Sequence, residues 1–149
     1  MKTEKLPILL AEDDPDDRYL IGEALDESRV RGELYIVEDG DELLDYLHRK
    51  GKYSDAENWP RPGLILLDLN MPRKDGREVL EEIKANPELR AIPIVVLTTS
   101  QAEEDIIRSY NSGVSGFITK PVTFDGLLDV MESIKDYWLN TVKLPPDSK

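Results

Sequence analysis

The pattern of apolar and polar positions divides the chain into two kinds of segment that alternate. Short apolar runs occupy residues 6–11, 33–37, 63–67, 93–97 and 115–119. Between them, residues 15–28, 40–49, 75–85, 101–111 and 123–141 carry the features of amphipathic helices. Near-continuous apolar strands that alternate with helices are typical of a parallel sheet covered on both faces. The pattern predicts an α/β fold with a doubly wound sheet of five parallel strands, in the order 2-1-3-4-5.

Two segments fall outside this alternation. Residues 50–62 are polar and contain a glycine and two prolines, so we expect a long loop before the third strand. Residues 142–149 contain a pair of prolines, and we expect a flexible C-terminal tail. The expected organisation is one domain over residues 1–141, followed by this tail and by no output domain.

Composition narrows the classes of function. The chain has 149 residues and a formal net charge of −12, which disfavours broad binding of nucleic acid. It has no cysteine and a single histidine, His48, so a disulfide framework, a thiolate metal site and a histidine-based zinc site are excluded. We find no apolar stretch long enough to span a membrane and no signal peptide, and we expect a cytoplasmic protein.

Polar side chains follow four of the predicted strands at the point where each strand ends. They are Glu12 and Asp13 after the first strand, Asp68 and then Asn70 after the third, Thr98 after the fourth and Lys120 after the fifth. Because ligand sites in such sheets form beyond the carboxyl ends of the strands, we expect these side chains to converge. Asp14, by contrast, is expected to cap the helix that starts at Pro15.

The residue types at this edge indicate a chemistry. Carboxylates about 4 Å apart repel each other by roughly 1 to 4 kcal/mol per pair, so three of them together favour a bound cation. Oxygen ligands without histidine or cysteine suit a hard ion such as Mg²⁺. A carboxylate nucleophile beside Mg²⁺, a hydroxyl and an ammonium group indicates phosphoryl transfer.

Four motifs at these strand ends resemble the receiver domain of two-component response regulators. They are ILLAEDD (8–14), LILLDLNMPRKDG (64–76), IPIVVLTTS (92–100) and GFITKP (116–121). The resemblance covers about residues 6–140 and implies a flavodoxin-like (βα)5 fold. It implies a phospho-switch that accepts a phosphoryl group from a sensor histidine kinase. Such a protein catalyses its own phosphotransfer and dephosphorylation but no metabolic turnover.

The resemblance also implies roles for individual residues. Asp68 is the expected phosphorylation site, with Thr98 as the switch hydroxyl and Lys120 as the cation that pairs with the phosphoryl group. For the Mg²⁺ ion, Asp13 and Asp68 are the expected direct ligands. The remaining expected ligands are the backbone carbonyl of Asn70, and Glu12 through a water molecule.

Two features bear on the subclass. The loop over residues 51–62 and the long last helix resemble the small response regulators that partner phytochrome histidine kinases. For such a loop, a passive surface insertion is the commoner explanation. Phe117 occupies the position of the family's aromatic switch residue, where it lacks a hydroxyl, and it is equally well interpreted as a core residue.

With no output domain, signalling is expected to pass through contact with another protein, either a downstream target or a phosphotransfer protein. Apolar residues on the last helix form a stripe, which is usually core, but its aromatic end is expected near the sheet edge. Because the receivers that this chain resembles commonly dimerise through the fourth helix, fifth strand and fifth helix, the resemblance implies a homodimer through these elements. The predicted interface residues are Tyr110, Phe117, Leu127, Met131, Tyr137 and Trp138.

Two other classes of protein share parts of this pattern. An aspartyl-phosphate phosphatase also uses aspartate and Mg²⁺, but it favours an Asp-x-Asp pair, whereas here Asp68 is followed by Leu69 and Asn70. A flavodoxin-like cofactor binder favours a phosphate cradle rich in glycine, serine and threonine after the first strand. The acidic residues at 12–14 do not match that cradle.

Overall fold

The computed structural model describes residues 6–28, 32–68, 76–98, 116–119 and 123–134. Its strands are β1 (Leu6–Ala11), β2 (Gly32–Val37), β3 (Leu64–Asp68), β4 (Ile94–Thr98) and β5 (Gly116–Thr119). Its helices are α1 (Pro15–Glu27), α2 (Gly40–Leu47), the short 3₁₀ helix η1 (Gly51–Ser54), α3 (Gly76–Ala85) and α5 (Phe124–Ile134). The predicted helix over 101–111, the end of the last predicted helix and the tail over 142–149 lie outside the described residues.

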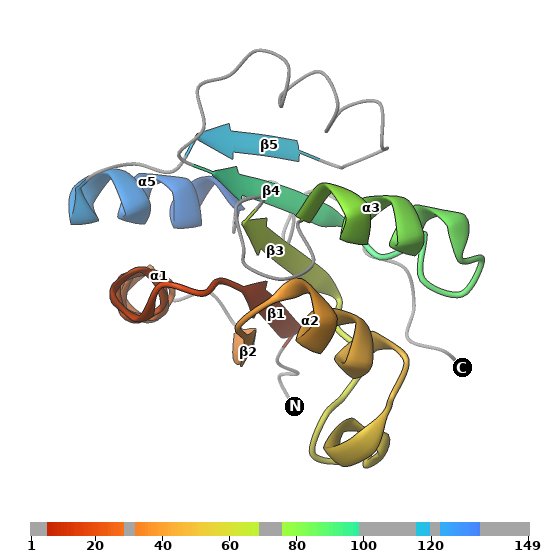
Figure 1. The fold of residues 1–149 in the computed structure, drawn as a ribbon. Helices are drawn as coiled ribbons and strands as arrows, with labels where there is room; N and C mark the ends of the chain where they lie inside the picture. The colour runs from red at the N-terminus through yellow and green to blue at the C-terminus, as the bar shows by residue number, and fades with distance from the viewer. Residues whose placement is uncertain (1–5, 29–31, 69–75, 99–115, 120–122, 135–149) are drawn as a thin grey trace, which may run out of the picture.

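The five strands form one parallel sheet in the order β2-β1-β3-β4-β5, which confirms the predicted topology (Figure 1). β3 lies at its centre, and every residue of β3 is buried. In the register, Ala11 of β1 lies beside Leu67 of β3, and Asp68 lies beside Leu97 of β4. The ends of β1, β3 and β4 therefore meet at one edge of the sheet.

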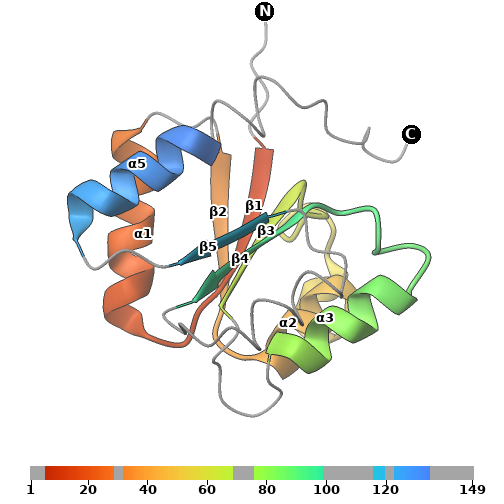
Figure 2. The ribbon, with the colours of Figure 1, turned by 90° about the horizontal axis from the view of Figure 1, so that it is seen from above.

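Helices cover both faces of the sheet, as predicted. In Figure 2, α1 and α5 lie on one face, and α2 and α3 lie on the other. Side chains of successive strand residues point to opposite faces, so each strand contributes to two cores. The face under α1 and α5 buries Ile8, Leu10, Leu64, Leu66, Val95 and Leu97 among others. The face under α2 and α3 buries Leu9, Ala11, Ile65, Leu67, Ile94 and Val96 among others.

Polar caps fix where three helices begin. The Asp14 carboxylate accepts a hydrogen bond of 2.9 Å from the amide of Asp16, and Pro15 occupies the first turn of α1. The Asp39 carboxylate accepts a bond of 2.8 Å from the amide of Glu42 at the start of α2. Thr123 caps α5 in the same way, through its hydroxyl and the amide of Gly126. The predicted capping role of Asp14 is therefore confirmed.

α2 ends two residues earlier than the sequence pattern suggested. Arg49 has a φ of 58°, in the left-handed region, and its amide donates to the carbonyl of Tyr46. The amide of Lys50 donates to the carbonyl of Asp45. These two bonds form a Schellman motif, which closes the helix before Arg49.

The segment over 51–62 is more ordered than the predicted loop. It begins with η1 and then brings Trp59 against Tyr35 of β2 and Tyr46 of α2, with ring centroids 6.1 Å and 6.0 Å apart. Tyr53 of η1 lies 5.0 Å from both Tyr46 and Trp59. We call these four residues the aromatic cluster. Because these rings extend the core under α2, the segment is anchored to the fold and is not confined to the surface.

Candidate functional site

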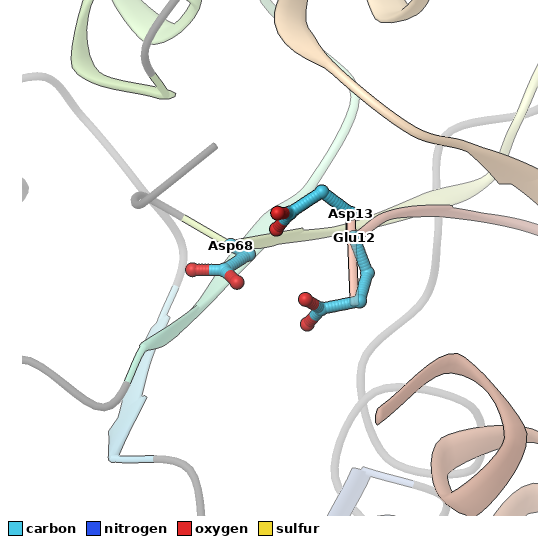
Figure 3. A group of neighbouring side chains, drawn as sticks. All are labelled: Glu12, Asp13 and Asp68. Atoms are coloured by element: carbon cyan, nitrogen blue, oxygen red, sulfur yellow. The ribbon is translucent and has the colours of Figure 1, made fainter. Parts of the chain in front are cut away.

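Three carboxylates come together where β1 and β3 end. Glu12 and Asp13 directly follow β1, and Asp68 is the last residue of β3. One carboxylate oxygen of each residue lies within 4.8 Å of the corresponding oxygens of the other two (Figure 3). We call these three residues the acidic cluster. The sequence predicted this convergence because neighbouring parallel strands bring their carboxyl ends to the same edge.

The members of the acidic cluster differ in their exposure to solvent. Glu12 is 1% exposed and Asp68 is 5% exposed, whereas Asp13 is exposed. The amide of Asp14 donates to Glu12 Oε2 at 3.2 Å, which holds the Glu12 carboxylate beside the turn that follows β1. Two buried carboxylates and a third at the surface give a negatively charged site with one side open to water.

This arrangement fits a divalent cation. Carboxylates at such separations repel one another. A cation bound among them attracts all three carboxylates and offsets that repulsion. All available ligand atoms in the acidic cluster are oxygens, which favours a hard ion. The exposed position of Asp13 leaves room for waters and for a phosphoryl oxygen on the same ion.

Arg18 of α1 contacts the backbone of the acidic cluster. Its Nη1 donates to the backbone carbonyl of Glu12 at 3.1 Å and to that of Asp13 at 3.2 Å. The same nitrogen lies 3.8 Å from Glu38 Oε2. Arg18 was not among the predicted site residues, because its partners are main-chain atoms. The only signal in the sequence is a basic residue a few positions after an acidic pair.

The remaining predicted site residues are placed only in part. Thr98 is the last residue of β4 and pairs with Thr119 of β5, so its backbone lies at the same edge as Asp68. The backbone of Phe117 pairs with Val96 in the sheet. The other predicted residues lie outside the described part of the chain: Asn70, Tyr110, Lys120, Tyr137 and Trp138.

Two of the predicted interface residues are core residues instead. Leu127 is 4% exposed and Met131 is 0% exposed, and both pack with the strands and with α1 beneath α5. A side chain enclosed by its own chain cannot also form a surface contact, so the prediction for these two positions is wrong. The apolar stripe on α5 marked the face that turns inward.

Within the described residues, no helix is long and apolar enough to cross a membrane.

Comparison with known proteins identifies the family. The profile of the response regulator receiver domain matches residues 8–132, which includes all three members of the acidic cluster. The chain belongs to the response regulator receiver domain family. Within this family it is 49% identical over 138 residues to the response regulator Rcp1 of Synechocystis, a match that covers 93% of this chain and 92% of that protein.

Solved receiver structures have the same fold. The phosphorylated cyanobacterial phytochrome response regulator RcpA superposes with a TM-score of 0.88 at 47% identity, over 96% of this chain and 100% of that chain. The Mn²⁺-bound form of Rcp1 superposes with a TM-score of 0.85 at 48% identity, over 95% of this chain and 99% of that chain. Phosphorylation and metal binding are thus described for receivers that are similar to this chain over most of its length.

Proposed function

We propose that this receiver accepts a phosphoryl group on Asp68 from a sensor histidine kinase, with Mg²⁺ held by the acidic cluster. The observation that supports the proposal most strongly is the approach of the Glu12, Asp13 and Asp68 oxygens to within 4.8 Å, at the carboxyl edge of a receiver sheet. Asp68 is the member that lies on the central strand, between β1 and β4. It is therefore flanked by the residues that bind the cation and by Thr98.

The transfer is a displacement at phosphorus. An Asp68 oxygen forms a bond to the phosphorus, and the bond from phosphorus to the donor nitrogen breaks, with its electron pair going to the histidine of the kinase. A divalent cation supplies charge neutralisation on the phosphoryl oxygens when it is bound. Asp13 and Asp68, with the Asn70 carbonyl, bind the cation directly in our proposal, and Glu12 contributes through water.

Two further residues bind the transferred group in the proposal. The Thr98 hydroxyl donates a hydrogen bond to one phosphoryl oxygen, and the Lys120 ammonium pairs with another. Water later attacks the phosphorus and breaks the acyl phosphate bond, which restores the Asp68 carboxylate. Both steps belong to the receiver itself, so the protein acts as a switch without metabolic turnover.

The partner proposed for this switch is a histidine kinase of the phytochrome class. The similar receiver RcpA is described as a phytochrome response regulator, and this chain matches the whole of its length. The segment over 51–62 is one of the two features by which this chain resembles receivers of this subclass. The signal then passes to a downstream target or a phosphotransfer protein by direct contact.

We also propose a homodimer through the fourth helix, β5 and the last helix. Its contact residues are Tyr110, Phe117, Tyr137 and Trp138, because Leu127 and Met131 belong to the core. Light scattering after size exclusion should give the mass of a dimer at tens of micromolar protein. A monomer both with and without phosphorylation would exclude this interface.

Nuclear magnetic resonance tests the proposed site with a phosphoryl mimic. The protein is titrated with beryllofluoride in the presence of MgCl₂, and amide shifts are followed at the ends of β1, β3 and β4. We expect saturable shifts at these three strand ends, and we expect none when EDTA replaces the cation. Absence of shifts at these three strand ends, or equal shifts in EDTA, would contradict the proposed site.

A further inference from the structure

Arg18 forms three contacts that converge on one nitrogen. Nη1 donates to the carbonyl oxygens of Glu12 and Asp13, at 3.1 Å and 3.2 Å, and approaches Glu38 Oε2 at 3.8 Å. The Arg18 side chain is 19% exposed, whereas that of Glu38 is 66% exposed. The contact with the Glu12 carbonyl is the more enclosed part of the arrangement, whereas the contact with the Asp13 carbonyl and the ion pair with Glu38 lie towards the solvent.

The two carbonyls belong to the residues that supply two of the three carboxylates in the acidic cluster. A peptide unit is planar, so fixing its carbonyl oxygen also fixes the direction of the neighbouring backbone. One guanidinium nitrogen that bonds to both carbonyls limits rotation of the backbone at Glu12 and Asp13. It thereby limits where their carboxylates can point.

Glu38 joins this arrangement to the start of α2. Its carboxylate approaches Arg18, while its amide donates to Glu42 Oε1 at 2.8 Å. The other oxygen of Glu42 accepts a hydrogen bond from the Tyr53 hydroxyl in the aromatic cluster. Arg18 is thus held from the turn after β2 as well as by its own position on α1.

We infer that Arg18 is a positioning residue for the cation site, which holds the backbone of Glu12 and Asp13 so that both carboxylates face Asp68. The inference rests on the proposed function, because it assumes that the acidic cluster binds a divalent cation. Arg18 touches neither the cation nor the phosphoryl group in this account. It acts through the two main-chain carbonyls.

The charge of Arg18 and its positioning role predict opposite effects on the affinity for Mg²⁺, and this makes the inference testable. Arg18 is a permanent positive charge beside an anionic site, and removing it lowers the repulsion that an incoming cation meets. On that basis, Arg18→Met should bind Mg²⁺ more tightly than the wild type. If positioning dominates, the same substitution should weaken Mg²⁺ binding, since groups that orient metal ligands typically contribute about 10- to 100-fold in affinity.

The experiment measures the Kd for MgCl₂ by calorimetry and for MnCl₂ by electron paramagnetic resonance, on the full chain. We expect the Kd of Arg18→Met to rise about tenfold or more for both ions. Arg18→Lys keeps the charge but has a shorter reach, and its Kd should lie between those of the wild type and Arg18→Met. An unchanged or lower Kd in Arg18→Met would overturn the inference.

Arg61→Met is the matched control. Its Nη1 also donates to a backbone carbonyl, that of Glu88 at 3.1 Å, and the substitution removes the same charge outside the acidic cluster. We expect its Kd to equal that of the wild type. If Arg18→Met does not fold by circular dichroism, Arg18→Lys decides: a raised Kd supports positioning and an unchanged Kd overturns it. A wild type that binds neither ion would refute the proposed function and the inference together, whereas binding that is insensitive to Arg18 refutes only the inference.

Discussion

The acidic cluster and the aromatic cluster differ in how they surround their polar groups. In the aromatic cluster, the Tyr46 hydroxyl donates to the carbonyl of Pro60 at 2.8 Å, and the Tyr53 hydroxyl donates to Glu42. Lys52 Nζ lies 5.2 Å from the ring centroid of Tyr53 and 5.4 Å from that of Trp59. Opposite or complementary groups are paired there, and the pairing stabilises the fold.

In the acidic cluster, groups of the same charge are brought together. Glu12 and Asp68 are almost fully buried next to Asp13, an arrangement that costs stability until a cation binds. The difference teaches that one region is built for stability and the other for binding. Replacing a member of the aromatic cluster should therefore lower the free energy of unfolding, whereas replacing a member of the acidic cluster should raise it when no cation is bound.

Removing a ring from the aromatic cluster should give the largest loss of stability. Tyr46 is 3% exposed and contacts the three other rings of the cluster. We expect Tyr46→Ala to lower the free energy of unfolding by about 3 to 5 kcal/mol, as for other large buried aromatic residues. Urea denaturation measures this change. Tyr19→Ala, at a 66% exposed position, is the control and should change stability by less than about 0.5 kcal/mol. Equal losses for both variants would refute the structural role of the cluster.

Adding a cation should stabilise the acidic cluster and leave the aromatic cluster unaffected. Mg²⁺ at one hundred times its Kd should raise the free energy of unfolding of the wild type by about 2.7 kcal/mol. Asp13→Asn should be about 1 kcal/mol more stable than the wild type in EDTA, because one repulsive charge is gone, and should lose the response to Mg²⁺.

Thermal melts with EDTA and with MgCl₂ measure both effects. Asp14→Asn is the matched control, because asparagine still caps α1 and the neighbouring acidic cluster is intact. It should keep the full response to Mg²⁺. A wild type whose melting temperature does not rise with MgCl₂ would contradict the interpretation of the acidic cluster as a cation site.

The smallest expected effect is a pH dependence that arises at Tyr53 in the aromatic cluster. Burial and the hydrogen bond to Glu42 raise the pKa of Tyr53 above its ordinary value of 10.0. A group whose pKa is raised by folding stabilises the folded chain while it is protonated. That contribution is complete below the unfolded-state pKa and is lost as the pH rises above it.

Tyr53→Phe removes this titrating group. We expect the wild type to lose stability more steeply than Tyr53→Phe above pH 10, with parallel curves at lower pH. Denaturation with urea across the alkaline range measures the two slopes. Identical slopes would show that folding does not raise the pKa of Tyr53.

Much of this arrangement follows from the sequence, and the exceptions have physical causes. The order of elements and the approach of Glu12, Asp13 and Asp68 were predictable, because parallel strands place their carboxyl ends at one edge. Arg18 was not, because it contacts backbone carbonyls that no pattern of residue types reveals. The aromatic cluster was missed because its rings come from three separate segments.

The error at Leu127 and Met131 has a different origin. Helical spacing shows that two residues share a face, but it does not show whether that face turns towards the sheet or towards a partner. In this fold the face of α5 that carries both residues is buried against α1 and the strands.

Mass spectrometry of the intact protein tests the central claim about Asp68 most directly. The wild type and Asp68→Asn are incubated side by side with acetyl phosphate and MgCl₂, and the fraction of each that gains one phosphoryl group is followed over time. We predict that the wild type gains one group and that Asp68→Asn gains none. Phosphorylation of Asp68→Asn at the rate of the wild type would contradict the claim that Asp68 is the acceptor.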